Sequence, residues 1–88
     1  MMKKLFYPNT KIQIRVGDKV RWYDDEELSE VIFIISTREY RADYMNSIDW
    51  FISEFQTGIM IDTPSAGLVL EDEECSNITF IQSAINND

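Results

Sequence analysis

Apolar and polar residues alternate with a period of two near the start of the chain, which predicts β-strands with one buried face. In residues 11–16 the positions expected to point inward are Ile12, Ile14 and Val16. Gly17-Asp18 then predicts a tight turn. Residues 19–23 resume as a strand in which Val20 and Trp22 share a face, opposite Lys19 and Arg21.

A continuous β-branched and aromatic run over residues 30–37 predicts a central strand that is covered on both faces. Four acidic residues at 24–27 precede this run, and they predict a solvated loop. Further along, residues 59–63 and 68–71 predict a hairpin, because Pro64 and Gly67 supply the backbone angles of a turn. After a polar turn at 72–75, residues 77–81 predict a short closing strand.

Residues 38–57 allow more than one interpretation. Apolar residues recur at helical spacing, which predicts one long helix that ends before Gly58; they are Tyr40, Tyr44, Ile48, Phe51, Ile52 and Phe55. Asn46 and Ser47 offer an internal helix start, so a turn followed by a short helix from about Ser47 is the alternative. A strand also stays open, because Ile48, Trp50 and Ile52 alternate with polar or smaller neighbours.

Eighty-eight residues suffice for one domain. The elements together predict a mainly β fold, a five-stranded small barrel whose closure removes exposed sheet edges. We expect an N-terminal extension at 1–10, a single barrel domain at 11–82 and a flexible tail at 83–88. The helical insertion 38–57 is expected between the second and third core strands.

The stretch Val-Gly-Asp-Lys-Val-Arg-Trp at 16–22 and the ending at 68–81 resemble the SH3-like small barrels, including Tudor-type and KOW-type domains. The opening is also similar to that of small uncharacterised gut-bacterial proteins with an acidic loop after it. This resemblance implies an SH3-like fold over 11–37 and 59–81 and brings no assigned activity. The insertion 38–57 departs from the pattern, since a simple small barrel needs only a short link there.

Charge is divided unevenly along the chain. The net charge is −8, but residues 1–41 carry a net charge of +1, whereas residues 42–88 hold nine acidic groups and no basic one. A nucleic acid requires a basic stripe, and a membrane-spanning helix requires about 20 apolar residues. The sequence offers neither, so neither partner is expected. A single cysteine and an N-terminal apolar run interrupted by Pro8 indicate a cytoplasmic protein rather than a secreted one.

Residue chemistry argues against an enzyme. The chain has no histidine, one cysteine and only isolated glycines, so it lacks the usual general base, a zinc ligand set and a phosphate-binding loop. Acidic neighbours at 72–74 disfavour a reactive Cys75. We therefore expect no cofactor and no catalytic residue. An enzyme that uses carboxylates alone, or a Ca²⁺ or Mg²⁺ site formed by converging acidic loops, are the alternatives.

The candidate site is a surface that binds a protein partner, or a second copy of the chain. Trp50 would be exposed if its segment is helical, because it lies about 100° from the apolar stripe. Aromatic and acidic residues complete the predicted site: Tyr23, Tyr40, Tyr44, Asp24, Asp25, Glu26 and Glu27. An acidic inhibitor, an immunity-type protein or a nucleic-acid mimic that binds a basic partner is the alternative function.

Overall fold

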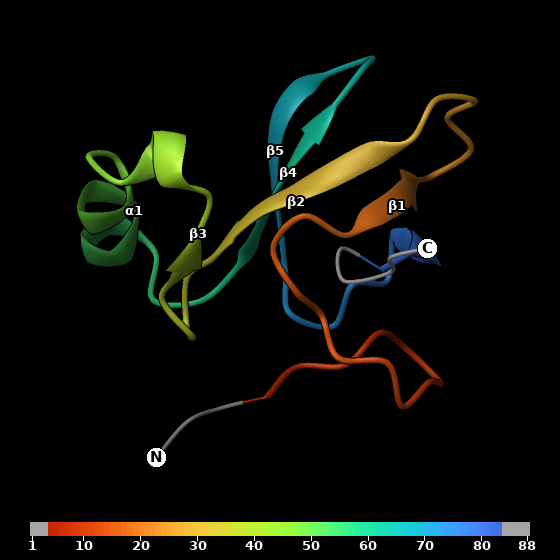
Figure 1. The fold of residues 1–88 in the computed structure, drawn as a ribbon, viewed down its shortest axis with the longest axis horizontal. Helices are drawn as coiled ribbons and strands as arrows, with labels where there is room; N and C mark the ends of the chain where they lie inside the picture. The colour runs from red at the N-terminus through yellow and green to blue at the C-terminus, as the bar shows by residue number, and fades with distance from the viewer. Residues whose placement is uncertain (1–3, 84–88) are drawn as a thin grey trace.

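The computed structural model describes residues 4–83 as an antiparallel β-sheet with one α-helix at its side (Figure 1). The elements are β1 (Lys19–Trp22), β2 (Ser29–Ile34), β3 (Glu39–Tyr40), the 3₁₀ turn η1 (Ala42–Tyr44), α1 (Ile48–Glu54), β4 (Ile59–Thr63), β5 (Gly67–Glu71) and β6 (Ile78–Gln82). This confirms the mainly β class. Of the expected tail, 84–88 lie outside the described residues, as do residues 1–3 of the expected extension.

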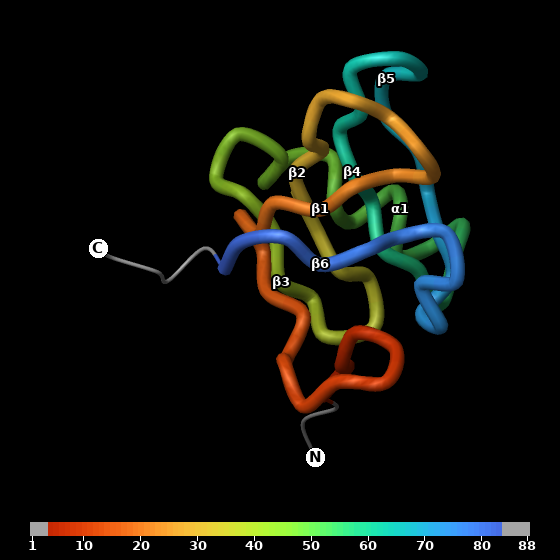
Figure 2. The backbone as a smooth tube through the Cα atoms, turned by 90° about the vertical axis from the view of Figure 1, so that its right-hand side faces the viewer, coloured from red at the N-terminus to blue at the C-terminus, as the bar shows by residue number. Residues whose placement is uncertain are grey.

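Strand order within the described residues is β5-β4-β2-β1-β6, and β3 pairs with β2 off this path. The last strand therefore returns to lie beside the first, which Figure 2 shows as β6 running along β1. The insertion falls between β2 and β4, which are the second and third strands of this path in chain order, as expected. The sheet nevertheless has six strands, since the insertion contributes the two-residue strand β3.

The prediction of a strand at 11–16 is wrong. Within residues 4–83 this segment makes only an isolated bridge, between Gln13 and Phe6. Its backbone bonds go to the preceding segment instead, because the chain reverses tightly and the Ile14 N–H donates to the Leu5 carbonyl at 2.8 Å. Ile14 is buried, but Ile12 is 39% exposed rather than inward.

The strand β2 is central and buried on both faces, as its apolar run predicts. Residues 31–35 are each at most 1% exposed. On one side Val31 and Ile34 pack in a core cluster with Val20 and with Ile59 and Ile61 of β4. On the other side Phe33 and its neighbours pack in a second cluster with Ile48 of α1. A register shift opposite β4, between residues 31 and 33, redistributes the side chains between the two faces.

The single long helix over the insertion is wrong, and the short helix from about Ser47 is correct. Arg38 has a φ of 60°, which reverses the chain and pairs Tyr40 with Phe33 of β2. Helix α1 begins only after Ser47 and ends at an extended Phe55. Gly58 therefore does not cap the helix. Its φ is +140°, and its lack of a side chain lets Leu70 of β5 approach, since an added Cβ would lie 2.9 Å from Leu70 Cδ1.

A buried hydrogen bond ties the N-terminal segment to the Gly-Asp turn. Leu5 and Tyr7, from the segment expected as an extension, are both in the core. The Tyr7 hydroxyl donates to Asp18 Oδ2 at 2.6 Å, and the Arg15 N–H donates to the same oxygen at 3.0 Å. Gly17 takes a φ of 96° in this turn. The Gly-Asp pair thus combines a left-handed backbone with a carboxylate that fastens the turn.

We expect Tyr7→Phe to lower the free energy of unfolding by about 1–3 kcal/mol, because a buried carboxylate oxygen then loses a donor. Burial first, and then the hydrogen bond and charge of Asp18, raise the pKa of Tyr7 far above its ordinary value, so its hydroxyl stays a donor at any physiological pH. Urea denaturation followed by tryptophan fluorescence measures the change. The control is Tyr23→Phe, which removes a hydroxyl from a largely exposed side chain; equal losses in the two variants would contradict the prediction.

Candidate functional site

The insertion places an aromatic cluster between the sheet and the surface. Phe33 of β2 contacts Phe51 of α1, with ring centroids 4.9 Å apart, and Tyr44 of η1 at 6.1 Å. Phe51 in turn contacts Trp50 edge to face at 4.8 Å and stacks with Phe55 at 6.3 Å. A continuous chain of rings therefore leads from the buried core to solvent, and such pairs favour one fixed arrangement.

Helix α1 has two distinct faces. Its inner face packs on the second core cluster through Ile48, Phe51 and Ile52. Its outer face consists of the exposed residues Asp49, Trp50, Ser53 and Glu54. The Trp50 side chain is 57% exposed, which confirms the expectation drawn from the helical spacing. A large exposed tryptophan on a braced surface is typical of a contact site for another protein.

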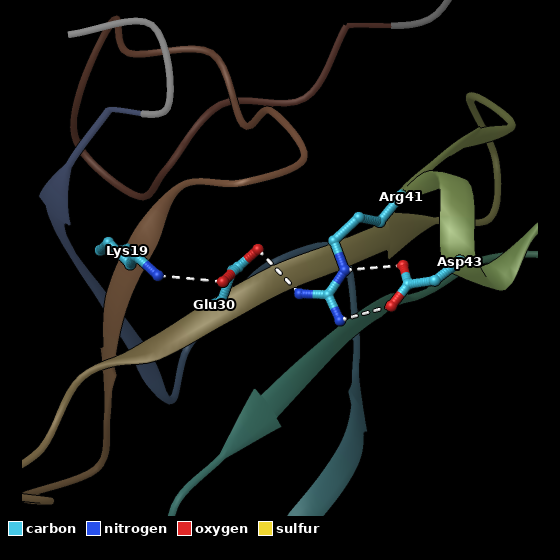
Figure 3. Close-up of polar contacts among 4 residues, drawn as sticks. All are labelled: Lys19, Glu30, Arg41 and Asp43. Carbon is cyan, nitrogen blue, oxygen red and sulfur yellow. Dashed lines mark hydrogen bonds and ion pairs between the residues drawn. The ribbon is translucent and has the colours of Figure 1, made fainter. Parts of the chain in front are cut away.

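A chain of charged side chains fastens the insertion to the sheet, and sequence reasoning missed it. Figure 3 shows the four residues in a row, from β1 to η1. The Lys19 Nζ donates to Glu30 Oε1 at 2.9 Å, and the Arg41 Nη1 donates to Glu30 Oε2 at 3.0 Å. The Arg41 guanidinium also holds Asp43 through two hydrogen bonds of 2.8 and 3.0 Å. Glu30 thus joins a strand of the sheet to the start of the insertion.

These contacts favour the ionised forms of Glu30 and Arg41. Partial burial acts to raise the pKa of Glu30, but the hydrogen bonds and charges of Lys19 and Arg41 outweigh it and hold that pKa below its usual range. The hydrogen bonds to Asp43 and then to Glu30 raise the pKa of Arg41. The Arg41 guanidinium lies 5.4 Å from the centre of the Tyr44 ring, which adds a cation–π contact. Asp43 and Arg41 therefore act as structural groups.

The structure divides the predicted site residues between two ends of the molecule. Tyr40 and Tyr44 lie at the end that carries Trp50, whereas Tyr23 and the loop 24–27 lie at the other, where β1 turns into β2 (Figure 1). Tyr40 is exposed on β3, and Tyr44 is half-buried under the Arg41 side chain. The two groups therefore cannot form one contact patch.

The acidic loop lies against the β4–β5 turn. A shallow depression of about 380 Å³ is lined by Asp25, Glu26, Glu27, Pro64 and Ser65. The Ser65 hydroxyl donates to Asp25 Oδ2 at 2.8 Å, and the Arg21 Nη1 donates to the Asp25 carbonyl at 2.7 Å. Across residues 4–83, no group of three or more cysteine, aspartate or glutamate side chains is placed to hold a metal ion.

Glu71 is a structural carboxylate, whereas the sequence placed it at a strand end and among the acids of the alternative Ca²⁺ or Mg²⁺ site. Only 9% of its surface is exposed. The Trp22 Nε1 donates to its Oε2 at 2.9 Å, and the Asn77 side-chain amide donates to its Oε1 at 3.0 Å. Trp22 packs against the core, as its place on an alternating strand predicts. Glu71 thereby links β1, β5 and the turn before β6.

Cys75 is fully buried in the first core cluster. Burial first, and then the charges of Asp72, Glu71 and Glu73, raise the pKa of its thiol to about 12. A thiol in this state is a poor nucleophile at neutral pH. This geometry agrees with the structural role expected from its acidic sequence neighbours.

Comparison with protein-family models, with curated proteins and with solved structures finds nothing that matches this chain. No helix in the described part of the chain has the length and apolar character needed to cross a membrane.

We expect stability at acid pH to depend on Glu30. Its pKa in the folded protein is lowered, and an unfolded glutamate titrates near about 4.3. The ionised group therefore stabilises the fold above that pH, and the contribution disappears as the pH falls through the folded-state value. Between pH 6 and pH 3, the free energy of unfolding should fall by about 0.5–1 kcal/mol less in Glu30→Gln than in the parent protein. Urea titrations at each pH test this, with the exposed Glu26→Gln as a control that should follow the parent; parallel curves for all three proteins would refute it.

We expect the Cys75 thiol to react with a disulfide reagent about a hundredfold or more slowly than free cysteine at pH 7, because labelling requires local opening. The labelling rate is measured from the absorbance of the thiolate that the reagent releases. Urea near the unfolding midpoint should restore fast labelling. Rapid stoichiometric labelling of the native protein would show that the thiol is accessible.

Proposed function

We propose that this protein is a small non-enzymatic interaction module, in which the outer face of α1 binds a protein partner. The observation that carries the proposal is Trp50, which exposes more than half of its side chain while Phe51 and Phe55 brace its ring. Tryptophan is the residue type most often found at the energetic centre of protein interfaces. A ring already held in place also loses little conformational entropy on binding.

The different roles of the two faces of α1 support this proposal. The sheet needs the inner face, because Phe33 would otherwise be exposed. The outer face carries no such requirement, since a charged or small residue at Trp50 would leave the inner contacts in place. Burial of an exposed tryptophan by a partner gives a reason for its presence that packing alone does not supply.

We propose further that the scaffold is an SH3-like barrel in a cytoplasmic protein. The return of β6 to β1 supports the first part, because it gives the described residues the strand order β5-β4-β2-β1-β6, in which only a pairing of β5 with β6 separates the sheet from closure. The tight turn before β1 and the short link between β5 and β6 also support it. The single free cysteine supports the second part.

A second candidate function is an acidic inhibitor that binds a basic partner at the loop 24–27. The depression lined by three carboxylates and Pro64 favours it. Association with such a partner would slow steeply as salt is added, because long-range attraction would govern the encounter.

We expect Trp50→Ala to leave the fold intact and to abolish retention of at least one protein when the immobilised chain is exposed to extract of its own source cells. The matched control is Phe6→Ala, which removes an aromatic side chain of similar exposure from the N-terminal segment. Circular dichroism should show the same folded spectrum for both variants. Sedimentation at several concentrations tests whether the partner is a second copy. Identical retained proteins and identical masses for Trp50→Ala and the parent would reject the proposal.

A further inference from the structure

The outer face of α1 carries negative charge that no lysine or arginine among residues 4–83 neutralises through an ion pair. Residues 42–57 include three acidic groups and no basic one. Asp43 is held by Arg41. By contrast, Asp49 and Glu54 make no ion pair or hydrogen bond through their side chains among residues 4–83. Two of the three carboxylates therefore remain available to a partner.

Both free carboxylates belong to the same surface as Trp50. Glu54 follows Trp50 by four residues, so the two side chains are neighbours on the outer face. Asp49 directly precedes Trp50 and is exposed as well. Trp50 is supported from its inner side, because Phe51 and Phe55 pack against it. This surface thus presents an exposed indole with Glu54 one helical turn away and Asp49 next to it in sequence, and neither carboxylate is paired among residues 4–83.

We infer that the partner of this surface is a cationic protein segment that places an arginine against Trp50, an inference that rests on the proposed function. A guanidinium can stack on the indole and at the same time donate to a neighbouring carboxylate, and it is easier to desolvate than an ammonium. The arginine would lie between the ring and either Glu54 or Asp49.

Charge and solvation argue against the other occupants. An anionic surface would be repelled by both carboxylates. A wholly apolar partner would bury Asp49 and Glu54 without compensation, which is costly. A second copy of the chain would bring another net charge of −8 and, in a symmetric contact, the same two acids.

The test uses hexa-arginine amide as the probe and follows the backbone amides and the two indole N–H signals of the ¹⁵N-labelled protein by NMR. Residues 49–55 and the Trp50 indole should shift together and yield one dissociation constant, while hexa-citrulline of the same length should leave them unmoved. An α1 that does not respond to hexa-arginine would overturn the inference, wherever else the peptide binds.

Two double variants separate local chemistry from total charge. Asp49→Asn with Glu54→Gln should weaken binding at α1 about fivefold, since two exposed charge contacts are lost. Glu26→Gln with Glu27→Gln removes the same charge from the loop at the other end of the molecule and should change binding at α1 less than about twofold. Trp50→Phe should also weaken it, because phenylalanine is the poorer cation–π partner. Equal effects of the two double variants would show that only net charge matters and would overturn the inference.

The outcomes of this experiment can be distinguished from those of the experiment that tests the proposed function. If Trp50→Ala abolishes retention of a natural partner but hexa-arginine does not shift α1, the interaction module stands and its cationic partner is rejected. If Trp50→Ala retains every protein that the parent retains, the proposed function is rejected, and this inference with it.

Discussion

Burial of β2 on both faces is the constraint on which the rest of the structure depends. A strand whose residues 31–34 are almost inaccessible to water needs cover on each side. The N-terminal segment with Leu5 and Tyr7 belongs to the core cluster on one side, and Ile48 of the insertion belongs to the cluster on the other. The insertion is therefore part of the core, although it interrupts the succession of strands.

Polar groups decide how these covering segments are attached. Asp18 fastens the N-terminal segment through Tyr7, Glu71 joins β5 to β1 through Trp22, and Glu30 joins the sheet to Arg41. Each carboxylate accepts hydrogen bonds from two different parts of the chain, so burial does not leave it without compensation. These three acidic residues are thus structural in a strongly acidic chain, as is Asp43, which Arg41 holds.

The two ends of the molecule have different chemistry. At one end, α1 presents a braced tryptophan with two exposed carboxylates; at the other, the loop 24–27 is acidic and lies against the β4–β5 turn (Figure 1). The first combines apolar area with charge, which suits a stable contact, whereas the second offers mostly charge, which suits attraction at a distance.

Local patterns in the amino-acid sequence were enough to predict several features of the fold. The alternation around Val20, the apolar run of β2 and the Pro64 hairpin each lie within a few residues, so the mainly β class, the central strand and the exposure of Trp50 could be predicted. Tertiary structure decided what depends on distant partners. Residues 11–16 bond to the segment before them, and the charged chain from Lys19 to Asp43 joins residues far apart in sequence. Helical spacing from Tyr40 to Phe55 gave no sign that Tyr40 pairs with β2, because a strand contact is fixed by the neighbour and not by the segment's own periodicity.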